Sequence, residues 1–326
     1  MLLMAWLNYD ITGKRIFIAG HTGMVGAALV RRFEQEDCTI LTCPRPELDL
    51  LDQAAVHDWL QKEKPDLVII AAGKSGSALA NQNRSADFMY ENLAISMHLI
   101  HGAYLAGVEK LINIAAPHIY PEMVHVPTSE HRLMSGPLDK AYESSATARL
   151  AALHLCDCYY RQYQKDFLTI VPAEIYGPGD NYDPLSGRVM PAFIRGAEEA
   201  KKANLTHMPI LGHSTAVREF IYVDDFADAL VVIIKHHQSH HLVNVGVRES
   251  ITMADLFYKV TDIVGFDGQP KFLRKIPHGV AERFLSSSGA EFCGWRPKYT
   301  LDEGIEKAWQ AYLKGDYREY DLNLKV

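Results

Sequence analysis

Cysteine is scarce in this 326-residue chain, which has five cysteines and no C-x-x-C pair. An odd, low count without metal-ligand spacing disfavours both a disulfide framework and a zinc site. We therefore expect reduced thiols, as in a cytoplasmic protein, and no metal. The stretch HHQSHH at 236–241 has no carboxylate or cysteine at ligand spacing nearby, so we interpret it as a solvated turn.

An excess of positive charge and long apolar runs are also absent. The chain has 33 Lys and Arg against 40 Asp and Glu, a formal net charge of −7. This balance disfavours general nucleic-acid binding, which needs concentrated positive charge. No apolar run approaches the roughly 20 residues that cross a membrane, so we expect no membrane partner. The apolar start MLLMAWL is short and has no positive flank before it, and we interpret it as an extra strand or packing segment.

Short apolar runs alternate with helical periodicity through the first half of the chain. The strand-like runs are at 15–20, 38–43, 66–72, 109–115 and 166–173. The segments with helical spacing are 24–36, 53–62, 86–107 and 141–164. Strands that alternate with helices form a parallel sheet covered on both faces. The sequence therefore predicts an α/β fold with a Rossmann-type, doubly wound parallel sheet.

The pattern changes after residue 177, where GPGDNYDPLSG is rich in turn-forming residues. Two later pieces, REFIYV at 218–223 and HLVNVGV at 241–247, look strand-like again. We therefore expect the dinucleotide-binding Rossmann domain to comprise residues 11–176 plus 218–248. A smaller substrate domain, binding a sugar nucleotide, is expected from residues 177–217 and 249–326.

A glycine-rich turn joins the first expected strand to the first helix. Gly20, Gly23 and Gly26 form G-x-x-G-x-x-G at this junction. Such a turn lets a pyrophosphate approach the backbone, and the helix N-terminus offers N–H groups to the phosphates. Within a βαβ unit this pattern predicts a dinucleotide site. Further residues expected to contact the cofactor are Met24, Val25, Asp49, Leu50, Ala71, Ala72, Gly73 and Asn92.

The end of the second strand indicates which dinucleotide is bound. An acidic residue there would favour NAD(H). The sequence instead has TCPR at 42–45, with no acidic residue before Glu47. Arg45, with Thr22 nearby, suits the 2′-phosphate of the cofactor, so we expect NADP(H) rather than NAD(H).

Longer motifs extend from the first strand to the last helix. They are IFIAGHTGMVGAALV, ELDLLD, AAGKSG, ADFMYENL, IYP at 119–121, IYGPGDNY, REFIYVDD and GWRPKYTLDEGI. With these motifs the chain resembles the extended short-chain dehydrogenases/reductases, and among them the GDP-L-fucose synthase family. The resemblance implies epimerisation of a GDP-linked 4-keto-deoxy-hexose at C3 and C5, followed by reduction at C4 by NADPH. It also implies a homodimer formed by the helices at 86–107 and 141–164.

The catalytic motifs of that family are altered in this chain. The family uses a Y-x-x-x-K pair, and here Tyr142 matches the tyrosine while Ala146 stands in place of the lysine. The strand end AAPHIYP puts Ala116 or Pro117 at the family's serine and His118 at its cysteine. The resemblance implies Tyr142 as general acid, and His118 is a candidate acid–base group because imidazole titrates near neutral pH. Arg149, seven residues after Tyr142, is about 10 Å along the helix axis, so we do not expect it to replace the lysine.

Several polar residues are expected to bind the substrate. Arg218, in REFIYVDD, matches an arginine that the family uses on the sugar-nucleotide pyrophosphate, and a guanidinium suits phosphate oxygens. Arg188 stands at the family's epimerase histidine, and Glu174 at an asparagine. The substrate-binding residues implied are Lys74, Glu174, Asn181, Arg188 and Arg218.

Two other functions remain open from the sequence. One is an epimerase or isomerase without net reduction, because epimerisation beside a ketone needs a base but no hydride. The other is a non-catalytic sugar-nucleotide-binding protein, since the family's serine and lysine are absent and fold alone does not imply function. The retained glycines, Tyr142 and Arg218 favour an enzyme.

Overall fold

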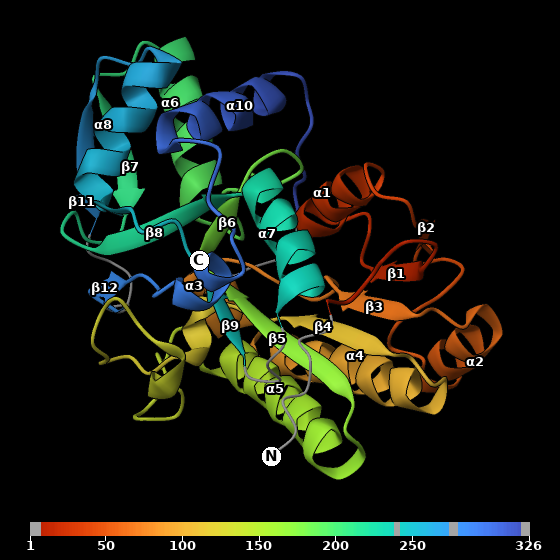
Figure 1. Cartoon of the computed structure of the whole chain (residues 1–326). Coiled ribbons are helices and arrows are strands. Elements are labelled where there is room, and N and C mark those ends of the chain that lie inside the picture. Colours follow the sequence, from red (N-terminus) through yellow and green to blue (C-terminus); the bar gives the residue numbers. More distant parts are fainter. Residues whose placement is uncertain (1–7, 238–241, 274–279, 321–326) are drawn as a thin grey trace.

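The computed structural model describes residues 8–237, 242–273 and 280–320. The apolar start at 1–7 and residues 238–241 of the histidine-rich stretch lie outside the described residues, so their interpretations stay predictions. Figure 1 shows a central sheet between helices, with a second group of strands and helices beside it.

Six parallel strands form the main sheet in the order β2-β1-β3-β4-β5-β9. Their bounds are β1 (Arg15–Ala19), β2 (Thr39–Leu41), β3 (Leu67–Ile70), β4 (Lys110–Ile114), β5 (Asp166–Pro172) and β9 (Val243–Val245). The chain moves from β1 to β2 on one side and then to β3 on the other. In such a sheet, ligands bind at the carboxyl ends of the strands near this reversal. The predicted doubly wound parallel sheet is confirmed.

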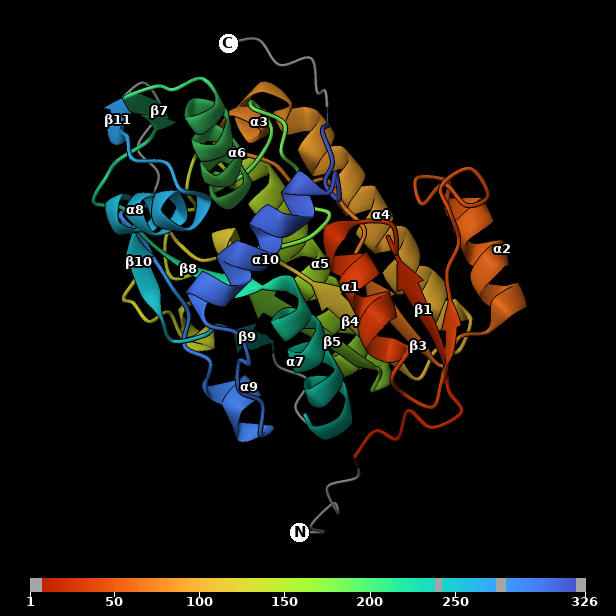
Figure 2. The ribbon, with the colours of Figure 1, turned by 90° about the horizontal axis from the view of Figure 1, so that it is seen from above.

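Helices cover both faces of the main sheet, as Figure 1 and Figure 2 show. One face carries α1 (Met24–Phe33) and α7 (Val223–His236), and the other α2 (Gln53–Glu63), α4 (Ser85–Leu105) and α5 (Glu143–Tyr163). Ile16 and Ile18 of β1 pack under α1 and α7, whereas Phe17 and Ala19 pack under α2, α4 and α5. Successive strand residues point to opposite faces, so a strand that is apolar throughout is buried on both sides.

A second apolar core lies beside the sheet, centred on Phe193, Phe257 and Ile305. Its helices are α6 (Val189–Lys202), α8 (Met253–Val264) and α10 (Leu301–Leu313). Its strands are β6 (Glu174–Tyr176), β7 (His207–Leu211), β8 (Val217–Tyr222), β10 (Ser250–Thr252), β11 (Gln269–Leu273) and β12 (Glu282–Arg283). The remaining short elements are α3 (Ala78–Asn83), α9 (Ser288–Phe292), η1 (Pro117–Ile119) and η2 (Glu130–Arg132).

The segment REFIYV forms a strand as expected, but this strand, β8, does not join the main sheet. It pairs with β6, β10 and β12, and the chain returns to the main sheet through α7 and β9. The buried carboxylate of Glu219 accepts hydrogen bonds from the backbone N–H groups of Val247, Arg248 and Leu285. These contacts hold β8 beside residues 247–248 and 285 and apart from the main sheet. The apolar pattern of REFIYV does not reveal them.

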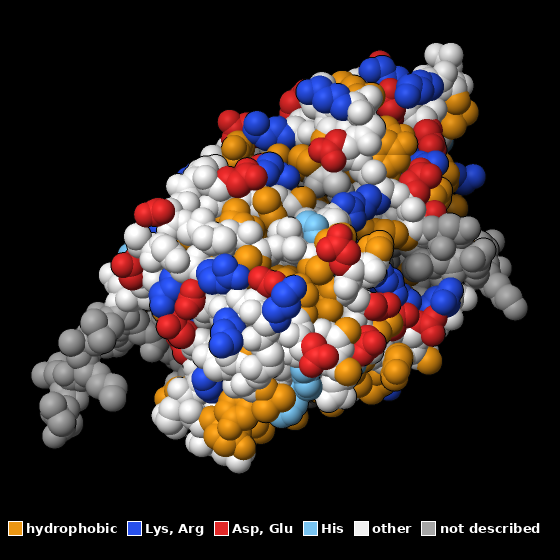
Figure 3. Space-filling view, turned by 90° about the vertical axis from the view of Figure 1, so that its right-hand side faces the viewer, with side chains coloured by type: hydrophobic (Ala, Val, Ile, Leu, Met, Phe, Trp, Pro, Cys, Tyr) orange, Lys and Arg blue, Asp and Glu red, His pale blue; other side chains and the backbone are white. Residues whose placement is uncertain are grey.

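The outer surface carries both signs of charge. On the face shown in Figure 3, Lys and Arg side chains are interspersed with Asp and Glu. Among residues 8–237, 242–273 and 280–320, no helix is long and apolar enough to cross a membrane. In the same ranges no group of three or more His, Cys, Asp or Glu side chains is arranged to hold a metal ion.

Candidate active site

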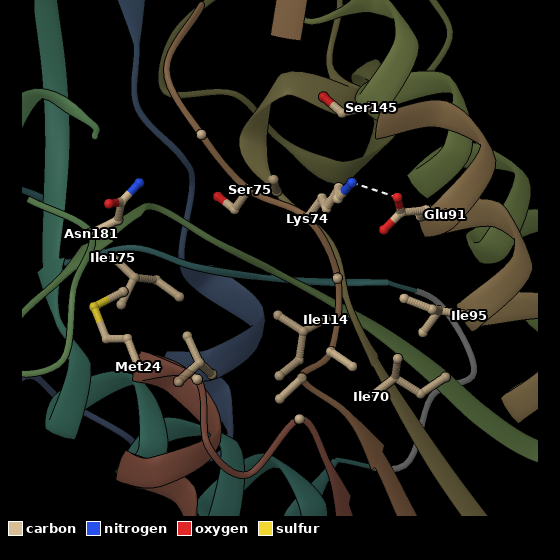
Figure 4. Close-up of a pocket in the computed structure, with 18 of the residues that line it drawn as sticks. Met24, Ile70, Lys74, Ser75, Glu91, Ile95, Ile114, Ser145, Ile175 and Asn181 are labelled. Atoms are coloured by element: carbon tan, nitrogen blue, oxygen red, sulfur yellow. Dashed lines mark hydrogen bonds and ion pairs between the residues drawn. The ribbon is translucent and has the colours of Figure 1, made fainter. Parts of the chain in front are cut away.

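A cavity of about 490 Å³ opens at the carboxyl ends of β1, β3, β4 and β5. Figure 4 shows that one side of it is apolar and the opposite side polar. The labelled apolar side chains are Met24, Ile70, Ile95, Ile114 and Ile175. Lys74 and Ser75 lie across from them in the upper part of the view, and Asn181 lies above Ile175. The cavity occupies the position where a doubly wound sheet binds its ligand.

The glycine turn closes tightly against the end of β3. Gly20 has φ +87°, and a Cβ atom on it would lie 2.7 Å from the Cα of Ala72. A Cβ atom on Gly26 would lie 2.1 Å from the carbonyl oxygen of Gly20. Gly23 is the N-cap of α1 and makes no side-chain capping bond. The turn therefore leaves a backbone cradle at a helix N-terminus, which fits the diphosphate of a dinucleotide.

Most residues expected at the cofactor site line this cavity. They are Gly20, Thr22, Gly23, Met24, Val25, Arg45, Asp49, Leu50, Ala71, Ala72 and Gly73. Gly26 lies behind the turn rather than on the cavity wall. Asn92 is buried and holds the loop after β3, because its Oδ1 accepts from the N–H of Lys74 at 2.8 Å and its Nδ2 donates to Phe88. The side chain of Arg45 is 73% exposed and lies 3.5 Å from Asp49.

Tyr142 and His118 lie side by side on the cavity wall. Tyr142 is the N-cap of α5, and His118 lies in η1 after β4. Their rings are parallel, at an interplanar angle of 1°, with centroids 3.8 Å apart. Burial, together with the negative charge of Glu174, raises the pKa of Tyr142 to about 12. Its hydroxyl is therefore protonated near neutral pH and able to donate a proton.

Sequence reasoning missed Arg283, which contacts His118, and Asp139, which in turn binds Arg283. Nη1 of Arg283 donates to Nδ1 of His118 at 2.6 Å, and Nη2 of Arg283 donates to the buried Asp139 at 3.1 Å. Burial, followed by the charge of Arg283, holds the pKa of His118 well below its usual value of about 6.5. Arg283 is 165 positions from His118 in the sequence, and no local motif signals this contact.

A second charged group faces the cavity from the other side. Nη2 of Arg188 donates to the carbonyl of Ile175 at 2.8 Å, and its guanidinium lies 3.7 Å from Glu174 and 3.5 Å from Asp180. Asp180 and Glu174 raise the pKa of Arg188 against the opposing effect of burial. Burial raises the pKa of Asp180. Glu174, Asn181 and Arg188, all expected to bind substrate, thus line one cavity.

Arg149 also lines the cavity, although its spacing from Tyr142 argued against it. Residues seven apart return to the same helix face after two turns, and long helical side chains lean toward the N-terminus. Nη1 of Arg149 donates to the carbonyl of Ile114 at 3.0 Å. Burial and the nearby Arg188 lower the pKa of Arg149 to about 10. Ala146, at the family's lysine position, is fully buried and has no side-chain charge to offer.

Arg218 is not part of the cavity wall. Its guanidinium donates to the backbone carbonyls of Val217, Val280 and Ala281. Lys74 does line the cavity, and its ammonium is paired with Glu91, as Figure 4 shows.

The last described residues complete the wall near Asn181. Arg318 and Tyr320 line the cavity. The N–H of Arg318 donates to the carbonyl of Asp180 at 2.9 Å, and the N–H of Tyr182 donates to the carbonyl of Arg318 at 2.7 Å. Sequence reasoning did not include either residue, because nothing in the local pattern links 316–320 to the loop at 177–188.

This fold, with its glycine turn and a tyrosine at the start of α5, defines an epimerase/reductase of the extended short-chain dehydrogenase/reductase type. The chain belongs to the NAD dependent epimerase/dehydratase family, whose model matches residues 16–246. The resemblance drawn from the motifs is thereby confirmed.

The similarity to known proteins extends over almost the whole chain. A GDP-L-fucose synthase from Sinorhizobium fredii is 40% identical over 94% of this chain and 97% of its own length. A structure of a GDP-6-OMe-4-keto-L-xylo-heptose reductase from Campylobacter jejuni has a TM-score of 0.86 and 28% identity, covering 94% of this chain and 99% of that one. A GDP-mannoheptose C4 reductase from the same organism, with NADP bound, has a TM-score of 0.82 and 30% identity, covering 94% and 100%.

Proposed function

We propose that this protein is an NADP(H)-dependent epimerase/reductase acting on a GDP-linked 4-keto-deoxy-hexose. One observation carries the proposal: the glycine turn and the pair formed by Tyr142 and His118 open into a single cavity. A dinucleotide on the turn and a sugar beside Tyr142 would therefore meet in one chamber. The similar proteins, which are named for GDP-sugar chemistry and include one with NADP bound, support the same activity.

The chain has suitable groups for each part of the cofactor. The N–H groups at the start of α1 would hold the diphosphate, and Arg45, with Thr22 nearby, would hold the 2′-phosphate. The guanidinium of Arg149 would face the end of the cofactor that lies beside β3 and β4. When bound, the cofactor supplies the hydride for reduction.

The remaining cavity residues would handle the sugar. Tyr142 holds a proton at its hydroxyl oxygen and would transfer it to the C4 oxygen during reduction. Arg188 would bind and orient the substrate together with Lys74 and Asn181, which lie on the polar side of the cavity. Arg218 would reach the pyrophosphate only if its backbone contacts were exchanged for phosphate oxygens.

A second candidate is an epimerase without net reduction. The replacement of the family's lysine by Ala146, together with a carboxylate at Glu174 near His118, favours this alternative. Such an enzyme would exchange protons at C3 and C5 while leaving the C4 ketone in place.

One assay separates these candidates. The purified protein is incubated in deuterated water with NADPH and GDP-4-keto-6-deoxy-mannose, and nicotinamide absorbance and deuterium at C3 and C5 are followed. We expect both NADPH loss and deuterium uptake. Deuterium uptake alone would establish the epimerase. Neither signal, in a sample that binds NADPH by titration, would contradict both enzymatic proposals.

We also propose that the protein is a cytoplasmic homodimer formed through α4 and α5. On α4, Tyr90 is 69% exposed and Met97 is 52% exposed, and Tyr163 at the end of α5 is exposed as well. Apolar side chains exposed at this level on packed helices suit burial against a second copy. Sedimentation of wild type and of Tyr90→Glu/Met97→Glu tests the dimer, and a monomeric wild type would contradict it.

The proposed cytoplasmic location is supported by the cysteines. All five are free thiols, as expected in a reducing compartment.

A further inference from the structure

The two ring nitrogens of His118 have different surroundings. Nδ1 lies 2.6 Å from Nη1 of Arg283. A guanidinium nitrogen only donates, so Nδ1 must present its lone pair. A neutral imidazole carries one proton, which therefore resides on Nε2. Nε2 lies 3.8 Å from Oε1 of Glu174, too far for a hydrogen bond, and both residues line the cavity.

The orientation of the His118 ring is fixed from two directions. Arg283 is itself held by the buried carboxylate of Asp139 at 3.1 Å. The other oxygen of Asp139 accepts from the N–H of Ala141 at 2.9 Å. The parallel ring of Tyr142, with its centroid 3.8 Å away, covers one face of the imidazole. The ring therefore has little freedom to turn Nδ1 toward the cavity.

The charges around His118 oppose its protonation. Four arginines act on it, Arg283, Arg149, Arg188 and Arg218, and the carboxylate facing it is Glu174. Burial adds to their effect and lowers the pKa of His118. A ring that resists protonation is a weak base, whereas its N–H remains a good hydrogen-bond donor.

We infer that His118 acts as a neutral hydrogen-bond donor, whose Nε2–H stabilises the ketone oxygen of the substrate as that oxygen gains negative charge. Arg283 and Asp139 are positioning residues that set this tautomer. The inference rests on the proposed function for the identity of the substrate. It reverses the role of acid–base group near neutral pH that the sequence suggested for His118.

The same oxygen gains charge in both reactions proposed for the site. In epimerisation the C–H bond next to the ketone breaks, its electron pair forms a C=C bond, and the carbonyl π pair moves to oxygen. The proton passes to a carboxylate, and among the described residues Glu174 faces His118. A proton then returns to the opposite face of that carbon while the oxygen pair re-forms the C=O bond, which completes the epimerisation. In reduction a hydride adds to the carbonyl carbon, and the π pair again moves to oxygen. One fixed donor therefore serves both steps.

The tautomer is tested first, by NMR of the full-length protein labelled with ¹⁵N-histidine, with His118→Gln used to assign the signal. We expect a protonated Nε2, an unprotonated Nδ1 and no titration between about pH 5 and 8, the range where a free imidazole changes charge. A proton on Nδ1, or titration in this range, would overturn the inference.

Arg283→Met tests the positioning role in the same experiment. It removes the donor to Nδ1, so we expect a mixture of tautomers or a titration of His118 that wild type lacks. Arg161→Met, an exposed arginine at the far end of α5, is the control and should leave the His118 signal unchanged. An unchanged signal in Arg283→Met would show that Arg283 does not set the tautomer.

Two substitutions of His118 then separate a donor from a base. Glutamine keeps an N–H near the position of Nε2 but cannot take up a proton, and leucine has neither function. We expect kcat to fall about tenfold or less in His118→Gln but about 10²–10³-fold in His118→Leu, as for loss of one oxyanion donor. Equal losses would overturn the donor role, provided NADPH titration shows that both variants are folded.

Failure of the proposed function gives a different result. A wild type that neither consumes NADPH nor takes up deuterium with GDP-4-keto-6-deoxy-mannose would contradict that function. The NMR measurement needs no substrate, so it still decides which nitrogen of His118 carries the proton.

Discussion

The guanidinium of Arg149 donates a hydrogen bond to the main-chain carbonyl of Ile114, the last residue of β4, at 3.0 Å. This contact places a positive charge at the carboxyl end of the sheet, in the cavity that also holds the glycine turn. The family pattern has its positive charge four residues after the tyrosine, where this chain has Ala146. Here α5 supplies a positive charge seven residues after Tyr142, at Arg149.

Arg149→Met should weaken NADPH binding. Methionine keeps much of the side-chain length but removes the hydrogen-bond donors, and losing one such contact to the ligand costs about 1 kcal/mol, or roughly 5–10-fold in Kd. Fluorescence titration of NADPH measures the effect. Arg161→Met on the same helix is the control, and equal affinities in the two variants would contradict a cofactor role for Arg149.

Arg45→Ala should change the choice of cofactor. The exposed guanidinium is available for a 2′-phosphate, and hydrogen bonds to charged groups contribute about 1.5–3 kcal/mol. We expect NADPH affinity to fall by about 10–100-fold while NADH affinity stays the same. Titration of both cofactors against Arg45→Ala and against Lys62→Ala, an exposed lysine on α2, provides the comparison. A parallel loss for NADPH and NADH would rule out recognition of the 2′-phosphate.

Gly26→Ala should destabilise the fold more than Gly23→Ala. A methyl group at 26 would overlap the carbonyl oxygen of Gly20, whereas at 23 the nearest atom lies 3.3 Å away and φ is −70°. Overpacking of this kind costs about 1–3 kcal/mol. Urea unfolding of the two variants measures the difference in the free energy of unfolding. Equal stabilities would mean that the turn relaxes freely and that the cradle is not rigid.

His118 should make the protein less stable in mild acid. Its pKa is lowered in the folded state, so below about pH 6.5 the unfolded chain binds a proton that the folded chain does not. Stability attributable to this residue is complete above that pH and is lost as the pH falls, by at most about 1.4 kcal/mol per pH unit. Unfolding of wild type and His118→Gln at several pH values isolates the contribution. If the difference between them does not change with pH, His118 titrates alike in both states.

The main sheet and the glycine turn of the site follow from local sequence patterns. The contacts of His118 and the position of Arg149 do not. Apolar runs and the glycine turn predict the main sheet and its switch point, because both depend on neighbours in sequence. The contact between His118 and Arg283 escapes prediction because it spans 165 positions, and the Arg283–Asp139 pair that supports it spans 144. Arg149 escapes prediction because the spacing of Cα atoms along a helix does not include the reach of a long side chain toward the helix N-terminus.

The residues at 316–320 make part of the cavity wall depend on a stretch of chain far from the glycine turn. Residues 316–320 seal the wall formed by the loop at 177–188, through backbone bonds from Gly179, Tyr182 and Arg318. The glycine turn, by contrast, is built from the end of β1, the start of α1 and the end of β3. Loss of the residues from 316 onward would therefore open the wall beside Asn181 and leave the dinucleotide cradle intact.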